Sequence, residues 1–161
     1  MTAIVRVGLG YDLHRLGKER KLILGGIEIE SDKGLVGHSD GDVLLHAIID
    51  AMLGAAGMGD IGEQFPDTDP AYKDIDSSHL LKRTLLMLGE RGFGCLNVDA
   101  TLVLEKPKLS PYKEAMRERV AKLLNLHVEA VSIKAKTNEG VDAVGQGEAI
   151  ACHAVVGLAV K

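Results

Sequence analysis

Two histidines and one aspartate in the first third of the chain are the residue types of an open zinc site. Asp12 and His14 stand two residues apart, and His46 follows within an apolar stretch. Two imidazoles and one carboxylate fill three zinc positions and leave the fourth for water or substrate. A single histidine of this kind is more often a hydrogen-bonded core residue than a ligand. Three ligands from two elements reverse that preference and predict a metal-dependent enzyme.

A predicted strand holds the first two ligands. The residues from Ile4 to Leu9 have the apolar pattern of a strand, and the segment Gly10-Tyr11-Asp12-Leu13-His14 continues it. Because alternate side chains of a strand point to one face, Asp12 and His14 can reach the same ion.

A predicted helix from Asp42 to Gly57 holds the third ligand. Apolar residues recur there at helical spacing, and Ser39 or Asp40 is the expected N-cap. The polar members of this helix lie at positions i, i+4 and i+8, and they are Asp42, His46 and Asp50. Such a polar stripe on an otherwise apolar helix should face a site.

Composition fits one compact domain that spans residues 1–161. The chain is 46% hydrophobic and has a formal net charge of -4, and no basic patch indicates a nucleic-acid partner. Its apolar stretches are too short to cross a bilayer, so no membrane association is expected. Cys95 and Cys152 lack disulfide or metal-ligand spacing, so we expect free thiols in a reducing, cytoplasmic environment. A plastid-type protein whose transit peptide had been removed would look the same.

The remaining elements predict a mixed α/β (α+β) fold. Beyond the first strand and the site helix, they are a hairpin at 21–29 around Gly25-Gly26, a helix near 80–88 that ends at Gly89 or Gly92, a strand at 97–104, a helix at 116–124 with Ser110-Pro111 as N-cap and first residue, and strands at 131–137 and 149–160. The order βββ-α-α-β-α-β-β predicts helices gathered on one face of a sheet.

A loop from Gly59 to Pro70 carries four acidic residues among glycines and prolines. These residues are Asp60, Glu63, Asp67 and Asp69. They are suited either to binding substrate hydroxyls or to capping short turns, and composition favours the turn caps.

A second loop, from Lys134 to Gly140, follows a predicted strand. The Thr137 hydroxyl and nearby backbone N–H groups suit phosphate oxygens, and Glu139 offers a hard oxygen ligand of the kind that Mg²⁺ or Mn²⁺ prefers. The alternative is a solvated strand end without a ligand.

Three segments carry a resemblance to a known family. They read GYDLHRL from Gly10, LGGIEIESDKGLVGHSDGDVLLHAIIDAMLGAAGMGDIGEQFPDTDP from Leu24, and KAKTNEG from Lys134. From about Arg6 to Val160, the chain resembles the 2-C-methyl-D-erythritol 2,4-cyclodiphosphate synthases of the non-mevalonate isoprenoid pathway.

The resemblance implies a phosphorus-oxygen lyase. Such an enzyme converts 4-diphosphocytidyl-2-C-methyl-D-erythritol 2-phosphate to 2-C-methyl-D-erythritol 2,4-cyclodiphosphate and CMP. The 2-phosphate attacks the β-phosphorus of the same molecule, so no protein nucleophile is needed. Catalysis would then depend on positioning and charge neutralisation.

The resemblance also implies roles for individual residues. Asp12, His14 and His46 would bind zinc, Glu139 would bind Mg²⁺ or Mn²⁺, and two further residues would contact the transition state, namely His38 and Thr137. The implied substrate-binding residues are Asp12, His14, His38, Ser39, Asp60, Ile61, Gly62, Phe65, Pro66, Asp67, Thr68, Asp69, Lys108, Lys136, Thr137, Asn138 and Glu139. The segment 104–110 matches the loop that recognises cytosine.

The family fold implies a homotrimer with a four-stranded sheet and a small N-terminal hairpin in each subunit, and with active sites between subunits. In better-known members an aromatic residue and the arginine of a Gly-Arg-Gly triplet line a central cavity that holds an isoprenoid diphosphate. This chain has Ala143 and Gly145-Gln146-Gly147 instead. We therefore expect weak or absent isoprenoid binding in that cavity.

Two other functions use the same ligands. A zinc-dependent phosphohydrolase of a nucleotide-linked substrate would attack phosphate with metal-bound water and release two products. A non-catalytic, zinc-stapled trimeric nucleotide-binding module would use the metal only as a structural element. Structural zinc sites usually have four protein ligands, whereas three are predicted here.

Overall fold

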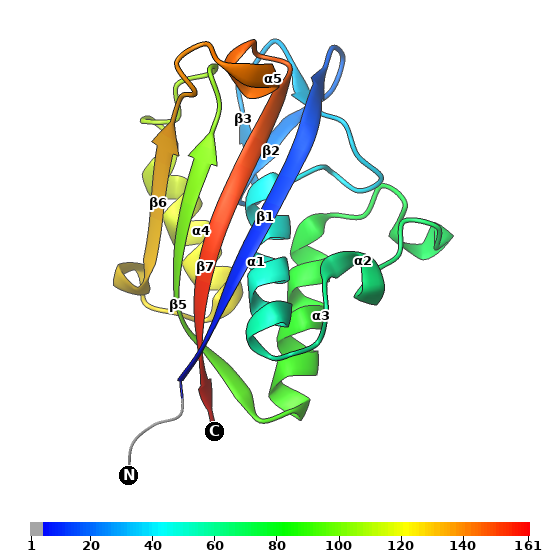
Figure 1. Ribbon diagram of the computed structural model, residues 1–161, viewed down its shortest axis with the longest axis vertical. Helices are drawn as coiled ribbons and strands as arrows, with labels where there is room; N and C mark the ends of the chain where they lie inside the picture. Colours follow the sequence, from blue (N-terminus) through cyan, green and yellow to red (C-terminus); the bar gives the residue numbers. More distant parts are fainter. Residues whose placement is uncertain (1–4) are drawn as a thin grey trace.

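The computed structural model describes residues 5–161 and shows a mixed sheet with helices packed against it (Figure 1). Ile4 of the predicted first strand lies outside the described residues. The main sheet has five strands in the order β4-β1-β7-β5-β6. Its strands are β1 (Val5–Gly17), β4 (Gly34–Leu35), β5 (Phe93–Val103), β6 (Val131–Lys136) and β7 (Ala149–Val160). The four predicted strands are all present, and the two-residue β4 adds a fifth.

The predicted hairpin is also present, as a separate two-stranded sheet of β2 (Leu22–Leu24) and β3 (Ile27–Ile29). In the main sheet β1 and β5 run antiparallel to β7, whereas β5 and β6 are parallel. The carboxyl ends of β1, β5 and β6 therefore meet at one edge of the sheet, which is the upper edge in Figure 1.

The long helices cover one face of the sheet, as predicted. They are α1 (Val43–Ala55), α3 (Ser77–Glu90) and α4 (Lys113–Leu124), and the short ones are α2 (Ile61–Gln64), α5 (Asp142–Gly145) and the 3₁₀ turns η1 (Pro70–Tyr72) and η2 (Val128–Ala130). Helix α1 packs on β1 and β7, and α4 packs on β6. None of the helices in residues 5–161 is long and apolar enough to cross a membrane.

Two glycines let α1 approach β1 closely. A Cβ atom on Gly8 would lie 1.8 Å from the carbonyl oxygen of Ala51, and one on Gly10 would lie 1.9 Å from that of Ala47. Any larger residue at either position would push the helix off the sheet. This close contact brings His46 on α1 next to Asp12 on β1.

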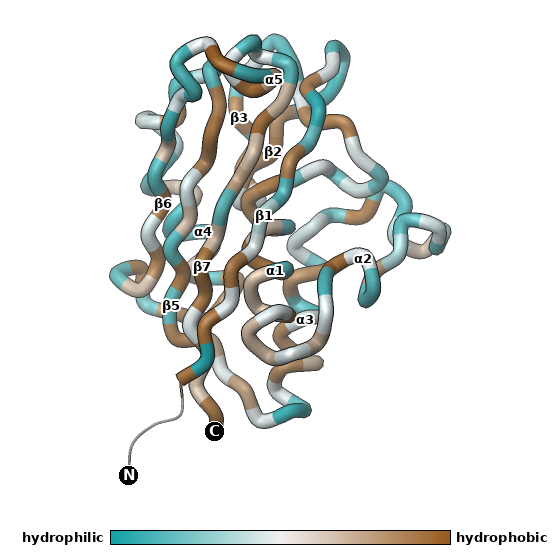
Figure 2. Tube along the Cα trace, viewed as in Figure 1, coloured by the Kyte–Doolittle hydropathy of each residue, from teal (hydrophilic) through white to brown (hydrophobic). Residues whose placement is uncertain are grey.

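The opposite face of β1 carries large apolar side chains that are exposed. Val7 and Leu9 are each 69% exposed, Tyr11 is 51% exposed, and Leu13 is 45% exposed. Hydrophobic residues recur along both β1 and β7 (Figure 2). A sheet that packs its core on one face normally presents polar residues on the other. The helix-free face of β1 therefore departs from this usual pattern.

The start of α1 differs from the prediction. Its N-cap is Asp42, and neither Ser39 nor Asp40 takes that role. The Asp42 carboxylate accepts hydrogen bonds from the backbone N–H of Leu45 at 3.0 Å, Gly25 at 3.0 Å and Gly26 at 2.8 Å. One buried side chain thus caps the helix and holds the hairpin turn. Complete burial, with the nearby Asp40 charge, raises the pKa of Asp42 to about 6 despite these bonds.

Of the other two long helices, α3 ends as the sequence predicts, whereas α4 begins later than predicted. Helix α3 ends at Glu90, and Gly92 follows with φ of 77°. Helix α4 begins at Lys113 after Tyr112, which makes no side-chain capping bond, so the predicted N-cap at Ser110 is wrong. A backbone bond from Tyr112 N to Leu109 O closes a turn there, and the helix begins only after it.

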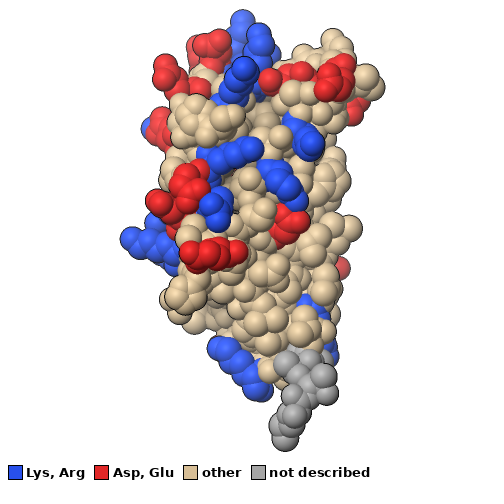
Figure 3. All heavy atoms as spheres, turned by 90° about the vertical axis from the view of Figure 1, so that its left-hand side faces the viewer, with Lys and Arg blue, Asp and Glu red and all other residues tan. Residues whose placement is uncertain are grey.

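Charged side chains cover the outer strands of the sheet. Figure 3, seen from the β6 side, shows basic and acidic residues intermixed over the upper part of the molecule. Lys134 on β6 pairs with Asp99 on β5. Because β6 is an edge strand, charges on it oppose unwanted pairing with another chain.

Candidate functional site

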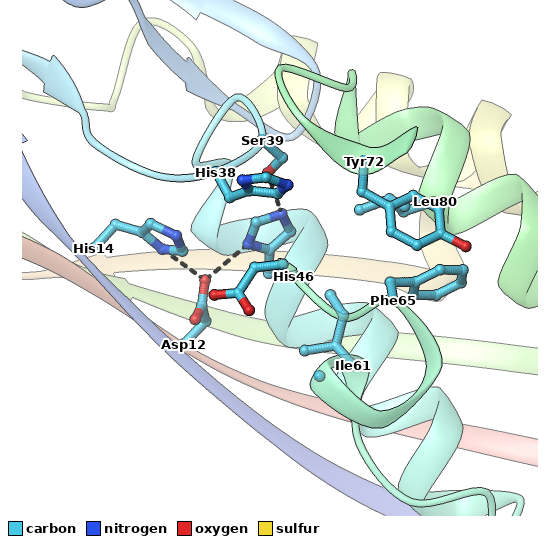
Figure 4. Close-up of a pocket in the computed structure, with 11 residues that line it drawn as sticks. Asp12, His14, His38, Ser39, His46, Ile61, Phe65, Tyr72 and Leu80 are labelled. Carbon is cyan, nitrogen blue, oxygen red and sulfur yellow. Dashed lines mark hydrogen bonds and ion pairs between the residues drawn. The ribbon is translucent and has the colours of Figure 1, made fainter. Parts of the chain in front are cut away.

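The three predicted metal ligands meet where α1 crosses β1. Asp12 and His14 come from the strand, and His46 comes from the helix (Figure 4). The Oδ2 atom of Asp12 lies 2.9 Å from Nδ1 of His14 and 3.1 Å from Nδ1 of His46. The ligand atoms of the three residues all lie within 4.8 Å of one another. One divalent ion can therefore contact all three.

A buried nitrogen without a partner shows that these residues fit a metal ion. Nδ1 of His14 is buried and forms no hydrogen bond with any of residues 5–161. Asp12 Oδ2 lies 2.9 Å away, but the two groups are not aligned as donor and acceptor. Buried polar atoms are nearly always paired, so an orphan beside a carboxylate is explained by a cation that both would bind.

The charges in the cluster support the same conclusion. Burial tends to raise the pKa of Asp12, but its interactions with His14 and His46 outweigh this and lower it to about 2. Burial also tends to lower the pKa of His46, whereas Asp12 and the charges of Asp42 and Asp40 raise it above its ordinary value. Asp12 is thus a fixed negative charge at neutral pH, which attracts a cation.

Of the predicted polar stripe on α1, only His46 belongs to this cluster. Asp42 is turned into the helix start and the hairpin, so the prediction that it faces the site is wrong. Asp50 accepts a hydrogen bond from the backbone N–H of Ile61 at 3.1 Å and so ties α2 to α1.

A pocket of about 250 Å³ opens beside the cluster. Its lining residues are Asp12, His14, His38, Ser39, His46, Ile61, Gly62, Phe65, Asp67, Tyr72 and Leu80. Tyr72 and Leu80 were not predicted to line a pocket, because an isolated aromatic residue and a leucine on the apolar face of a helix give no local signal of a binding site. One wall is polar and holds the histidines, while Ile61, Phe65 and Leu80 form the opposite apolar wall (Figure 4).

The acidic loop forms the rim of this pocket. Asp60 caps α2 by accepting from Glu63 N at 2.9 Å, and Asp69 caps η1 by accepting from Ala71 N at 2.9 Å. The turn-capping interpretation is confirmed for both residues. His38 Nε2 lies 3.4 Å from the carbonyl oxygen of Asp69, so the loop contacts the predicted catalytic histidine. Four predicted residues of the loop do not line the pocket, namely Asp60, Pro66, Thr68 and Asp69.

The second predicted group lies on the far strands. Thr137, Asn138 and Glu139 follow β6, which is separated from β1 by β7 and β5. Glu105 holds this loop by accepting from Asn138 N at 2.9 Å and Gly140 N at 3.4 Å. Two further predicted residues, Lys136 and Lys108, are exposed near the same ends of β6 and β5. No member of this group lines the pocket beside Asp12.

A second cavity of about 480 Å³ lies between the short helix α5 and the sheet face opposite the long helices. Its lining residues are Tyr11, Leu13, Val103, Asn138, Asp142, Ala143, Val144, Ala151 and His153. The rings of Tyr11 and His153 pack with centroids 4.9 Å apart. Gln146 donates from Nε2 to the carbonyl oxygen of Gly140 at 2.7 Å.

The chain resembles known proteins over nearly its whole length. A protein from Chloroherpeton thalassium named 2-C-methyl-D-erythritol 2,4-cyclodiphosphate synthase is 56% identical over 151 residues, which cover 94% of this chain and 96% of that protein. A protein of the same name from Alkaliphilus metalliredigens is 54% identical over 154 residues, with coverage of 96% and 97%.

Solved structures agree with the fold. The bifunctional IspDF from Campylobacter jejuni has a TM-score of 0.95 at 40% identity, and the match covers 99% of this chain and 43% of that one. The Plasmodium falciparum IspF in complex with CDP has a TM-score of 0.86 at 32% identity, with coverage of 100% and 99%. The YgbB family model matches residues 5–159. Together with the three candidate metal ligands and their pocket, these matches establish that the chain belongs to the YgbB family.

Proposed function

We propose that this chain converts 4-diphosphocytidyl-2-C-methyl-D-erythritol 2-phosphate to 2-C-methyl-D-erythritol 2,4-cyclodiphosphate and CMP, a step in isoprenoid precursor synthesis. The observation that carries the proposal is the cluster of Asp12, His14 and His46 at the mouth of a pocket, in a chain whose relatives at 52–56% identity bear the synthase name. The reaction is that of a phosphorus-oxygen lyase.

The pocket has the chemistry that this substrate requires. A zinc ion held by Asp12, His14 and His46 would polarise a phosphate oxygen and neutralise its charge. His38 and Ser39 stand beside the cluster, where their side chains can orient substrate phosphates. The apolar wall opposite suits the carbon skeleton of methylerythritol. Binding both ends of the molecule brings the 2-phosphate near the β-phosphorus, which is the main requirement of an intramolecular reaction.

The residues after β6 supply the rest of the site in this proposal. Glu139 would hold Mg²⁺ or Mn²⁺, Thr137 would contact the transition state, and Lys136 and Asn138 would bind phosphate oxygens. Because β7 and β5 separate this group from Asp12, three interstrand spacings of about 4.8 Å lie between them. In the proposed homotrimer, a second copy of the chain would bring its own Thr137 group to the pocket.

The exposed face of β1 supports such an assembly. Val7, Leu9 and Tyr11 are more than half exposed there, and a homotrimer with active sites between subunits would cover them. The substrate's cytidine would then contact the segment 104–110 of a neighbouring subunit. Two solved relatives are described as CDP-bound forms, which agrees with a cytidine diphosphate moiety in the substrate.

The two alternative functions are less well supported. The cluster has three members within residues 5–161, which leaves a bound metal open and disfavours a purely structural zinc. Against a phosphohydrolase, the relatives at 52–56% identity bear the name of a synthase and not that of a hydrolase. The single domain of 161 residues and the cytoplasmic location stay predictions.

The experiment is ³¹P NMR of the zinc-loaded protein with the diphosphocytidyl substrate and Mg²⁺. Two coupled cyclic-diphosphate resonances, together with free CMP, are expected. Inorganic phosphate in their place would indicate the hydrolase. An unchanged spectrum from protein with bound zinc would indicate the structural role.

A further inference from the structure

We propose that Ser77 and Asp40 are positioning residues for the metal centre, because they hold His46 in the tautomer whose Nδ1 binds the ion. This inference rests on the proposed metal-binding role of His46 and is independent of the cyclisation itself. Neither residue lines the pocket, so neither is expected to touch the substrate.

The hydrogen bonds around Ser77 have only one consistent direction. Its hydroxyl donates to the Asp40 carboxylate, which also accepts from the Ser77 backbone N–H at 3.0 Å. An ionised carboxylate can only accept, and a serine hydroxyl has only one proton to give. Ser77 Oγ lies 2.8 Å from Nε2 of His46 and must therefore accept from it. The proton of a neutral His46 ring is then on Nε2.

The position of that proton determines which nitrogen can bind a metal. With Nε2 protonated, the free lone pair of His46 is on Nδ1, which lies 3.1 Å from Asp12 Oδ2 on the cluster side. A metal-ligating histidine generally donates its other N–H to a neighbouring acceptor, and this bond sets its tautomer, orientation and basicity. Asp40 and Ser77 supply that acceptor here.

Burial makes the arrangement rigid. Ser77 is the first residue of α3 and is 0% exposed, and His46 is 7% exposed. Asp40 also accepts from Asp42 N at 3.0 Å, so its carboxylate joins the start of α1 to the start of α3. Ser39 Oγ is a second neighbour of Nε2 at 3.1 Å. However, Ser39 lines the pocket and is available to substrate, whereas Ser77 is not.

The test is zinc affinity, measured by competition with a chelating dye on the purified protein. Removal of a hydrogen-bond partner outside the metal ligands typically weakens binding about 10- to 100-fold, and we expect this loss for Ser77→Ala and Asp40→Asn. Ser77→Thr keeps the hydroxyl and should restore most of the affinity. Ser78→Ala is the matched control, since Ser78 is a buried serine of the same helix that bonds Asp76.

An unchanged zinc affinity in Ser77→Ala would overturn the proposal, even if the wild-type protein cyclises its substrate. Weakened zinc binding would support it even if no cyclic product formed. A long-range ¹H–¹⁵N NMR spectrum of the zinc-loaded wild type needs no variant and should show the His46 proton on Nε2. A proton on Nδ1 would refute the assignment whatever the variants do.

Discussion

The position of Asp12 between two histidines determines the charge of its carboxyl group. Its carboxylate lies between the Nδ1 atoms of His14 and His46, and these neighbours keep its pKa near 2 although it is largely buried. An ionised carboxylate flanked by two imidazoles is a cation site whose affinity depends on all three groups.

The first prediction at this scale concerns His46. His46→Ala should abolish zinc binding and turnover, because the cluster would lose its only ligand from α1. Metal content per chain is measured by mass spectrometry alongside the NMR assay. His127→Ala removes an exposed histidine before η2 and should change neither quantity. Full metal content in His46→Ala would remove His46 from the ligands.

The second prediction concerns Thr137. Thr137→Ala should lower turnover by about 10²-fold, the scale of losing one transition-state donor. Its zinc content should stay normal, because Thr137 lies at the end of β6, away from the cluster. Ser132→Ala, an exposed hydroxyl on the same strand, is the control. Turnover close to wild type would exclude Thr137 from the catalytic residues.

At the scale of secondary-structure elements, aspartates define the helix starts around the site. Asp42, Asp60, Asp69 and Asp76 each accept a backbone N–H at the beginning of a helix or 3₁₀ turn. Several of these helices deliver site residues: α1 carries His46, and α3 begins with Ser77. The capping bonds therefore fix the residue at which each helix begins, and with it the place of the helix's functional side chains in the site.

Asp76 yields a prediction about pH. Burial tends to raise the pKa of Asp76, but its bonds to Ser78 and the charges of His79 and Arg119 lower it below 3.8. A carboxylate whose pKa is lower in the folded state stabilises the fold above the unfolded value, and this contribution is lost as pH falls through the folded value. Asp76→Ala should therefore lower the free energy of unfolding by about 1 kcal/mol at neutral pH, and by less in acid.

Urea denaturation of both proteins, at neutral pH and below the ordinary aspartate pKa, measures this difference. Asp76→Asn should retain most of the cap but lose the pH dependence, since an amide accepts the same bonds without titrating. If Asp76→Ala lowered the free energy of unfolding by the same amount at both pH values, the assignment of a lowered pKa to Asp76 would be wrong.

At the scale of the whole molecule, the unusual feature is a sheet with apolar residues on both faces. Gly8 and Gly10 face α1, whereas the exposed apolar residues Val7, Leu9 and Tyr11 of β1 face away from the helices. The proposed homotrimer would bury this face and bring the Thr137 loop of one copy to the metal cluster of another.

Leu9→Glu tests the assembly. A charge in the middle of the exposed β1 face should dissociate the homotrimer and abolish turnover, because burying an unpaired charge is unfavourable. Zinc binding should persist, since Asp12 and His14 point to the other face. Light scattering measures the mass, and Leu86→Glu is a control on α3, where Leu86 is 70% exposed. A wild-type protein that is monomeric would refute the homotrimer.

The second cavity, between α5 and the sheet, should bind isoprenoid diphosphates weakly. Ala143 lines the cavity, and Gln146 donates a hydrogen bond to the carbonyl oxygen of Gly140. Because position 146 holds a neutral glutamine and not an arginine, it has no positive charge to pair with the phosphates. Calorimetry with farnesyl diphosphate should detect little binding, and Gln146→Arg should increase it. A tight complex with the wild-type protein would show this prediction to be wrong.

The sequence by itself determined most of the secondary-structure elements and the three candidate metal ligands. Strand alternation places Asp12 and His14 on one face, and helical spacing places His46 on an apolar helix; both are local patterns that depend only on near neighbours. The hairpin, the three long helices and four of the five main strands followed from the same periodicities. The resemblance, and not spacing, identified the reaction and most of the pocket residues.

Only the tertiary structure decided which groups share a contact. Asp42 caps α1 in place of Ser39 or Asp40, because its carboxylate also holds the hairpin turn. Ser77 bonds to a histidine 31 residues earlier in the chain, and no local pattern marks such a pair. The separation of Thr137 from Asp12 depends on strand order. These features arise from contacts between distant segments, whose geometry is set by packing and not by propensity.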